Sequence, residues 1–284
     1  MSNSIQTVGI IGSGTMGNGI AQACATHGIR VVLVDINKAA IDKGLATVAS
    51  SLDRLIKKEK ISAADKEIAL SLIHGSTGYD DLKGAQLVIE AATESEALKI
   101  KILQQLDGLL APEVIVATNT SSISITKLAA ATQRPDRFIG MHFFNPVPMM
   151  ALVEIIRGLQ TSDATHDAVK ALAERLGKSP ITVKNAPGFV VNRILVPMIN
   201  EAFFVLAEGL ATPEDIDAGM KLGTNQPIGP LALADMIGLD VCLAVMKVYM
   251  AEFNDSKYRP APLLKEMVAA GWLGRKTGRG VYSY

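Results

Sequence analysis

The sequence predicts a two-domain protein: an N-terminal doubly wound α/β sheet with a protruding helical hairpin, then an all-α C-terminal domain. Three observations support this. Short apolar runs rich in β-branched residues alternate with helical patterns over residues 1–186, as in parallel sheets with crossover helices. A glycine-rich segment follows the first run. Over residues 187–284 helical patterns continue without strand-like runs, and the tetrapeptide NAPG marks the boundary.

The first elements form a β-turn-α-β unit. TVGII (7–11) is a continuous apolar run, as expected for a strand buried on both faces. The helical pattern from Met16 to His27 stops at Gly28, a helix-ending residue, and RVVLVD (30–35) is the second strand. Two such strands joined by a helix are expected to be parallel, with a right-handed crossover.

Residues 38–73 interrupt this rhythm. They show two amphipathic helical patterns joined near Ile61–Ser62. Ser62 with Asp65 three positions later is typical of a helix start. The segment is too long for a simple crossover, so we expect a protruding helical hairpin.

The alternation then resumes. We expect further strands at 87–92, 114–119, 138–143, 152–157 and 180–184, and further helices at 95–110, 124–131 and 164–177. In the second domain we expect helices at 188–210, 213–222, 230–253 and 260–271.

Composition narrows the class of protein. Hydrophobic residues make up 49% of the 284 residues and the formal net charge is zero, so no global field favours nucleic acid or an anionic membrane. Cys24 and Cys242 are far apart, which indicates two buried reduced thiols rather than a disulfide or metal cluster. We see no signal peptide and no apolar run of the ~20 residues that span a bilayer, so we expect a cytoplasmic protein without a metal.

The glycine segment GSGTMG (12–17) fits a dinucleotide-binding loop. It follows a buried strand and opens a helix, the context that makes the pattern specific. Gly12 allows the turn, Gly14 lets the backbone approach a pyrophosphate, and Gly17 lets the helix pack closely. Asp35 ends the next strand and is expected to bind ribose hydroxyls, favouring NAD over NADP. FAD uses the same fingerprint and stays an alternative, although the second domain has no flavin-like feature. The first domain is therefore expected to be Rossmann-type.

A candidate general base lies in GMHFFNPVPMMALVEII (140–156). His142 ends a predicted strand, where open α/β sheets bind ligands, and its ordinary pKa suits proton abstraction. Glu154, in the next strand, is the candidate partner that orients the ring, and Asn145 is near enough in the sequence to bind a substrate oxygen. A core histidine paired with a core acid is the structural alternative.

The other three histidines are interpreted as structural. His27 and His74 each precede a glycine at a predicted helix end, and His166 lies in a polar helix turn where we expect it to be solvated.

The segments GIIGSGTMGNGIA, IEAATE, ATNTSS, MHFFNPVPMMALVEII, NAPGFVVNR and LGRKTGRGVY resemble the short-chain (S)-3-hydroxyacyl-CoA dehydrogenases along nearly the whole chain. The resemblance implies reversible NAD-linked oxidation of an (S)-3-hydroxyacyl-CoA, such as (S)-3-hydroxybutyryl-CoA, to the 3-ketoacyl-CoA. It also implies that the C-terminal helices form a homodimer.

The resemblance assigns roles residue by residue. His142 is the base and Glu154 its orienting partner, while Ser121 and Asn192 hold the substrate's C3 oxygen or thioester carbonyl. Asn145 lies between cofactor and substrate. The cofactor site that the resemblance implies adds Met16, Glu94, Lys99, Asn119 and Lys276 to the glycine loop and Asp35, with Glu94 beside the nicotinamide ribose and Lys99 close to it.

The hairpin carries a basic run, RLIKKEK, with Arg54, Lys57, Lys58 and Lys60. Coenzyme A is a multi-anion, so Arg54 and Lys58 are candidates to bind its phosphates. An ordinary solvated helix face is the alternative.

Three rival functions stay open at this point. They are 3-hydroxyadipyl-CoA dehydrogenase, a dehydrogenase of a free hydroxy acid such as gulonate, and a non-catalytic structural protein of the lens λ-crystallin type.

Overall fold

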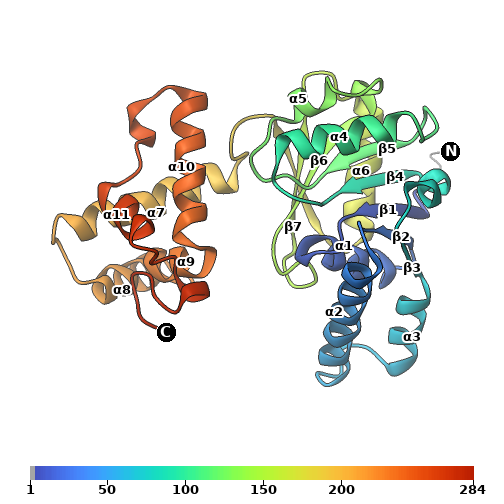
Figure 1. Cartoon of the computed structure of the whole chain (residues 1–284). Coiled ribbons are helices and arrows are strands. Elements are labelled where there is room, and N and C mark those ends of the chain that lie inside the picture. Colours follow the sequence, from blue (N-terminus) through green and yellow to red (C-terminus); the bar gives the residue numbers. More distant parts are fainter. Residues whose placement is uncertain (1–3) are drawn as a thin grey trace. The chain divides into compact units, whose positions relative to one another are not determined.

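The structure of the protein, a computed structural model, describes residues 4–284. The chain divides into two compact units, the first ending at Ala186 and the second running from Pro187 to Tyr284. Each unit is described by itself (Figure 1).

Unit 1 contains one eight-stranded sheet in the order β3-β2-β1-β4-β5-β6-β7-β8 within the described residues. The strands are β1 (Thr7–Ile11), β2 (Arg30–Val34), β3 (Ile73–Ser76), β4 (Leu87–Glu90), β5 (Ile115–Thr118), β6 (Phe138–Phe143), β7 (Leu152–Arg157) and β8 (Ser179–Lys184). Neighbouring strands from β3 to β6 are parallel, and β7 runs antiparallel to β6. The strand order reverses between β1 and β4, so the predicted doubly wound sheet is confirmed. Open α/β sheets bind ligands at such a point.

Helices cover both faces of this sheet. They are α1 (Thr15–Ala25), α2 (Lys38–Ile56), α3 (Ala63–Ser71), α4 (Glu96–Asp107), α5 (Ile125–Ala129) and α6 (Asp163–Arg175). Buried side chains of α1 and α6, including Ile20 and Val169, share one core with Met141 of β6. Gly140 points to the other face, where Ile125 of α5 lies against it.

The predicted hairpin is formed by α2 and α3, which lie side by side in Figure 1. Ser62 and Asp65 form a reciprocal capping box at the start of α3, as the sequence predicted. Lys66 and Asp53 tie the two helices with an ion pair of 2.6 Å. Val48 and Leu52 on the inner face of α2 belong to the sheet's core, so only part of the hairpin projects.

Strand β3 corrects one prediction. The predicted hairpin extended to residue 73 and His74 was expected at a helix end, but α3 ends at Ser71 and His74 lies in β3. This edge strand has only four residues, IHGS, and includes a glycine, so its strand pattern is too short to recognise.

Unit 2 is all-α. Its helices are α7 (Val191–Ala207), α8 (Pro213–Gly223), α9 (Pro230–Ile237), α10 (Leu239–Phe253) and α11 (Pro262–Ala269). The prediction of one helix over 230–253 was wrong, because Gly238, with φ of 107°, separates α9 from α10. The helices bury a common apolar core that includes Phe203, Leu231 and Leu264.

Candidate functional site

The glycine loop joins β1 to α1 at the crevice of the sheet. The Gly12 amide donates to the carbonyl of Val34 over 2.8 Å, and a Cβ on Gly12 would lie 2.6 Å from the carbonyl oxygen of Ala91. A Cβ on Gly17 would overlap the carbonyl of Gly12, whereas Gly14 has no neighbour within 4 Å of its Cβ position. The loop is therefore packed on its inner side and open at Gly14, where a pyrophosphate needs close access to the backbone.

Asp35 is held against this loop. Its Oδ2 accepts hydrogen bonds from the Ser13 amide at 2.6 Å and the Ser13 hydroxyl at 2.7 Å, and its Oδ1 accepts from the Ile36 amide at 2.7 Å. Partial burial opposes ionisation, but these hydrogen bonds hold the pKa of Asp35 below its ordinary value. The carboxylate is therefore ionised and fixed before any ribose arrives.

A hollow of about 290 Å³ adjoins Asp35, and its walls come from the glycine loop and α2. Gly44 allows α2 to approach the glycine loop closely, because a Cβ at this position would lie 2.8 Å from the carbonyl oxygen of Ser13. Lys43 and Thr47 complete the α2 side of the hollow. The residues present fit the adenosine end of a dinucleotide, and Met16, at the start of α1, is half-buried beside the loop.

His142 and Glu154 are direct cross-strand partners in β6 and β7. His142 Nδ1 lies 2.8 Å from Glu154 Oε2, and the two residues are 6% and 0% exposed. An ionised carboxylate can only accept a hydrogen bond, so Nδ1 donates. The sequence did not reveal how β6 and β7 align. Their register places His142 opposite Glu154, which produces the expected contact between the two side chains. The Phe144 ring lies 4.5 Å from the imidazole ring centre.

Ser121 lies in the loop after β5, and Glu94 binds that loop. Glu94 Oε1 accepts from the Thr120 hydroxyl at 2.6 Å, the Ser121 amide at 2.8 Å and the Ser121 hydroxyl at 3.1 Å. Partial desolvation opposes ionisation of Glu94, whose side chain is 41% exposed, but the Thr120 hydrogen bond and the Lys99 charge hold its pKa below the ordinary value. Asn119 contributes differently, since its Oδ1 accepts from the Phe143 amide at 2.9 Å and so joins the ends of β5 and β6.

Lys99 is buried, which was not foreseen from the sequence. Its ammonium donates to Glu90 Oε2 over 2.6 Å and lies 3.8 Å from Glu94 Oε2. The sequence contains a signal for this contact. Lys99 shares the buried face of α4 with Ile102, Leu103 and Leu106, and a lysine at such a position needs a buried anion.

Asn145 is exposed in the loop between β6 and β7 and precedes Pro146 through a cis peptide bond. Lys178 fixes this loop, because its ammonium donates to the carbonyls of Val147 at 2.6 Å and Met150 at 2.9 Å. Burial lowers the pKa of Lys178 from its ordinary value. Sequence reasoning missed Lys178, and no motif identifies it.

The predicted site residues of unit 2 are described within that unit. Asn192 is the second residue of α7 and is half-buried. Lys276 forms an ion pair with Asp240, with 2.6 Å between Nζ and Oδ1. An apolar hollow of about 450 Å³ lies beside α7, lined by side chains that include Ile194, Met198 and Leu233.

The basic run of the hairpin lies at the end of α2 and in the turn that follows it. Arg54 and Lys58 are both exposed, and the Arg54 guanidinium donates to the Ser50 hydroxyl at 3.1 Å. Both cations are accessible to an anionic ligand.

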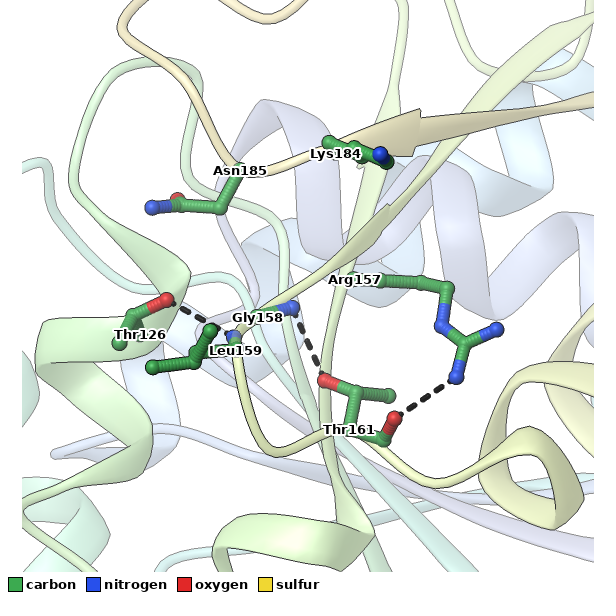
Figure 2. A pocket seen from close by; sticks show the side chains of 7 residues that line it. All are labelled: Thr126, Arg157, Gly158, Leu159, Thr161, Lys184 and Asn185. Carbon is green, nitrogen blue, oxygen red and sulfur yellow. Dashed lines mark hydrogen bonds between the residues drawn. The ribbon is translucent and has the colours of Figure 1, made fainter.

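A separate hollow of about 450 Å³ lies where β7 and β8 end (Figure 2). Because β7 is antiparallel to β6, the carboxyl end of β7 lies beside the amino end of β6. The hollow is therefore at the opposite ends of the strands from His142, which lies near the carboxyl end of β6. Arg157 in this hollow already binds the Thr161 carbonyl and the Asp163 carboxylate, at 2.8 and 2.7 Å. We therefore assign no ligand to it.

The remaining histidines differ in part from expectation. His27 lies just after the end of α1, as predicted, and its Nδ1 is 2.8 Å from the Ala23 carbonyl oxygen of that helix. The prediction that His166 is solvated was wrong: it is 9% exposed, and its ring nitrogens lie 2.8 Å from Asp167 Oδ1 and 2.9 Å from Thr182 Oγ1. The sequence places it in a polar turn but does not show that β8 covers that turn.

Residues 4–284 contain no helix that is long and apolar enough to cross a membrane. No three His, Cys, Asp or Glu side chains among these residues are grouped as metal ligands. Both cysteines are free and buried.

Comparisons with known proteins show the family of the chain. Residues 7–186 match the model of the 3-hydroxyacyl-CoA dehydrogenase NAD-binding domain, and residues 188–284 match that of the 3-hydroxyacyl-CoA dehydrogenase C-terminal domain.

The relatives match over the full length. A 3-hydroxybutyryl-CoA dehydrogenase of Bradyrhizobium diazoefficiens is 53% identical over 284 residues, covering 100% of this chain and 97% of that protein. One of Clostridioides difficile is 52% identical over 275 residues, covering 97% of this chain and 98% of that protein. The crystal structure of (S)-3-hydroxybutyryl-CoA dehydrogenase PaaH1 from Ralstonia eutropha shares 74% identity with a TM-score of 0.98, covering 99% of each chain. The protein therefore belongs to the 3-hydroxyacyl-CoA dehydrogenase family and is an NAD-dependent oxidoreductase.

Proposed function

We propose that this enzyme oxidises (S)-3-hydroxybutyryl-CoA to acetoacetyl-CoA, reversibly and with NAD. The observation that carries the chemistry is the buried His142–Glu154 pair, 2.8 Å apart at the carboxyl end of β6. The choice of substrate rests on two relatives, 53% and 74% identical to this chain, that are named as 3-hydroxybutyryl-CoA dehydrogenases.

In this proposal His142 is the general base. With Nδ1 donating to Glu154, the other ring nitrogen, Nε2, accepts the proton of the C3 hydroxyl. NAD, when bound at the glycine loop, supplies the hydride acceptor. Glu154 stabilises the imidazolium that forms, and the Ser121 hydroxyl and Asn192 amide bind substrate oxygens. Asn145, Met16, Asn119 and Lys276 remain predicted members of the binding site.

The first test is a spectrophotometric assay of NADH oxidation with acetoacetyl-CoA. His142→Ala should lower kcat by about 10²-fold or more, the typical contribution of a general base, while NADH affinity is retained. His74→Ala is the matched control, since its side chain is 70% exposed in β3. Near-normal turnover by His142→Ala would contradict the assignment.

The acyl group is tested with a substrate panel. In the oxidation direction with NAD, we expect kcat/KM to be highest for (S)-3-hydroxybutyryl-CoA and lower for 3-hydroxyadipyl-CoA, with no turnover of gulonate. A preference for either alternative would replace the proposed substrate.

We further propose that Arg54 and Lys58 bind phosphates of coenzyme A. Both are exposed cations on the hairpin, and each charge that contacts a phosphate makes binding sensitive to salt. Arg54→Gln with Lys58→Gln should raise KM for acetoacetyl-CoA and reduce its dependence on salt. Lys38→Gln, at the other end of α2, is the control, because Lys38 is paired with Asp42 at 2.7 Å.

We also propose a homodimer formed by the helices of unit 2. Several of their apolar side chains are exposed, including Ile194 at 67% and Leu222 at 86%, and large exposed apolar residues are typical of interaction surfaces. Analytical ultracentrifugation should give twice the chain mass, and a monomer at micromolar concentration would refute this.

A further inference from the structure

A buried ion pair lies at the carboxyl end of the sheet, outside the group of residues assigned above to proton transfer. Glu90 ends β4 and is 0% exposed, and Lys99 of α4 is 2% exposed. Glu90 Oε2 accepts from Lys99 Nζ at 2.6 Å and from the Thr118 hydroxyl at 2.7 Å. Glu90 Oε1 accepts from the Ala92 amide at 2.8 Å.

Both carboxylate oxygens of Glu90 thus accept hydrogen bonds, and its charge is compensated by Lys99. Such a pair is a poor source of stability, because well-packed apolar residues usually stabilise a core at least as well. Its position suggests another role. Glu90 and Thr118 are cross-strand partners at the last residues of β4 and β5, where the loops of the site begin.

A continuous chain of contacts leads from this pair to Ser121. Lys99 Nζ lies 3.8 Å from Glu94 Oε2, and Glu94 Oε1 accepts from both the amide and the hydroxyl of Ser121, at 2.8 and 3.1 Å. Glu90 thus binds Lys99, the Lys99 charge lies beside Glu94, and Glu94 binds Ser121. The Lys99 side chain is 2% exposed and the Glu94 side chain 41% exposed, so a ligand in this region meets Glu94 rather than Lys99.

We propose that Glu90 and Lys99 are positioning residues for catalysis, a buried pair that holds Glu94 and so places the Ser121 hydroxyl for the substrate. This inference rests on the proposed role of Ser121. It goes beyond the site residues named from the sequence, among which Glu90 is absent, and it changes the expected role of Lys99 from a coenzyme contact to a support for Glu94.

The test replaces the pair without leaving a buried charge. The double variant Glu90→Gln with Lys99→Gln, called the neutral-pair variant below, keeps a hydrogen-bonding side chain at each position and removes both charges. The matched control is Asp107→Asn with Arg134→Gln, which neutralises another buried pair, 2.8 Å apart. Asp107 lies eight residues beyond Lys99 on α4, roughly 12 Å along the helix axis, and Arg134 binds backbone carbonyls rather than the Ser121 loop.

Each variant is assayed for kcat/KM with acetoacetyl-CoA, for NADH dissociation constant and for melting temperature, with and without Ser121→Ala. We expect the neutral-pair variant and Ser121→Ala each to lower kcat/KM about tenfold or more. Their combination should be little worse than the poorer of the two, because both disturb one interaction. NADH affinity should change less than threefold, and the control pair should lose melting temperature but not kcat/KM.

Three results would overturn the inference alone while Ser121→Ala still loses rate. They are wild-type kcat/KM in the neutral-pair variant, a loss that multiplies with that of Ser121→Ala, and a loss that resides in NADH affinity. Wild-type kcat/KM in Ser121→Ala itself would overturn the proposed role of Ser121 and this inference with it.

Discussion

Asp35 is a carboxylate prepared for a ligand before the ligand binds. Its two oxygens are held by Ser13 and by the Ile36 amide, so a ribose diol meets an ordered acceptor. Hydrogen bonds to charged groups contribute about 1.5–3 kcal/mol, equivalent to roughly tenfold or more in affinity.

Asp35→Ala should therefore weaken NADH binding about tenfold and raise the relative kcat/KM with NADPH, since the carboxylate that repels a 2′-phosphate is removed. Fluorescence titration and rate assays with both coenzymes measure this. Ser13→Ala, which retains the backbone bond to Asp35, should have a smaller effect. An unchanged coenzyme preference in Asp35→Ala would show that the ribose is bound elsewhere.

Glu94 gives a prediction about pH. Its pKa in the folded protein is lowered from the ordinary value of 4.5, so its ionised form stabilises the fold. That contribution is complete above about pH 4.5, where the carboxylate is ionised in both states, and is lost as the pH falls through the lower folded pKa. The difference in unfolding free energy between wild type and Glu94→Gln should hence be constant from about pH 7 to 5 and shrink below about 4.5. A difference that grows in acid would give the pKa shift the opposite sign.

At the residue scale, sequence reasoning found groups whose chemistry shows in a motif. His142 and Glu154 were paired correctly because the apolar run around them offers no other acidic or basic partner. Glu90 and Lys99 were not paired. A single acid in LVIEAA and a single lysine on a helix face each look ordinary, and only the three-dimensional packing of α4 on β4 joins them.

At the element scale, α2 is both part of the hairpin and a wall of the coenzyme site. Gly44 brings α2 against Ser13, with only 2.8 Å between its Cβ position and the Ser13 carbonyl oxygen. Alanine ordinarily stabilises a helix by about 1 kcal/mol over glycine, so two effects compete at this position.

Gly44→Ala should push α2 away from the glycine loop and weaken NADH binding several-fold. Gly219→Ala is the matched control, because Gly219 lies within α8 with nothing inside 4 Å of its Cβ position. It should raise the unfolding free energy by up to about 1 kcal/mol and leave NADH affinity unchanged. Equal NADH affinity in both variants would mean that α2 does not shape the coenzyme site.

Element boundaries were predictable where a long periodic pattern meets a cap. Ser62 and Asp65 marked the start of α3 correctly for this reason. The short strand β3 was missed, because four residues do not establish a period. The break at Gly238 was also missed, since the apolar pattern continues through it from α9 into α10.

For the whole molecule, the sequence predicted a change from α/β to all-α, and the structure has two compact units of these classes. Each contains one of the two cysteines. Cys24 is 0% and Cys242 1% exposed, and burial raises the pKa of each thiol to about 12. Only the thiolate is an effective nucleophile, so both should resist alkylation until their own unit opens.

Unit 2 can be perturbed by itself through Asp217. This buried carboxylate accepts from the amides of Leu231 and Ala232 at the start of α9, at 2.8 and 2.9 Å, and from the Tyr282 hydroxyl at 2.8 Å. Asp217→Ala leaves those donors without their acceptor, which costs about 1–3 kcal/mol.

If the units unfold separately, as compact domains generally do, Asp217→Ala should lower the urea concentration at which Cys242 is alkylated and leave that of Cys24 unchanged. Mass spectrometry of the two cysteine peptides measures both transitions in one experiment. Trp272 is the single tryptophan of the chain. The urea concentration at which its fluorescence changes should move together with that of Cys242 alkylation, because both residues belong to unit 2. Tyr282→Phe, which removes only one of the three donors, should move the Cys242 transition less than Asp217→Ala. Equal displacement of the Cys24 and Cys242 transitions would show instead that the two units unfold as one cooperative structure.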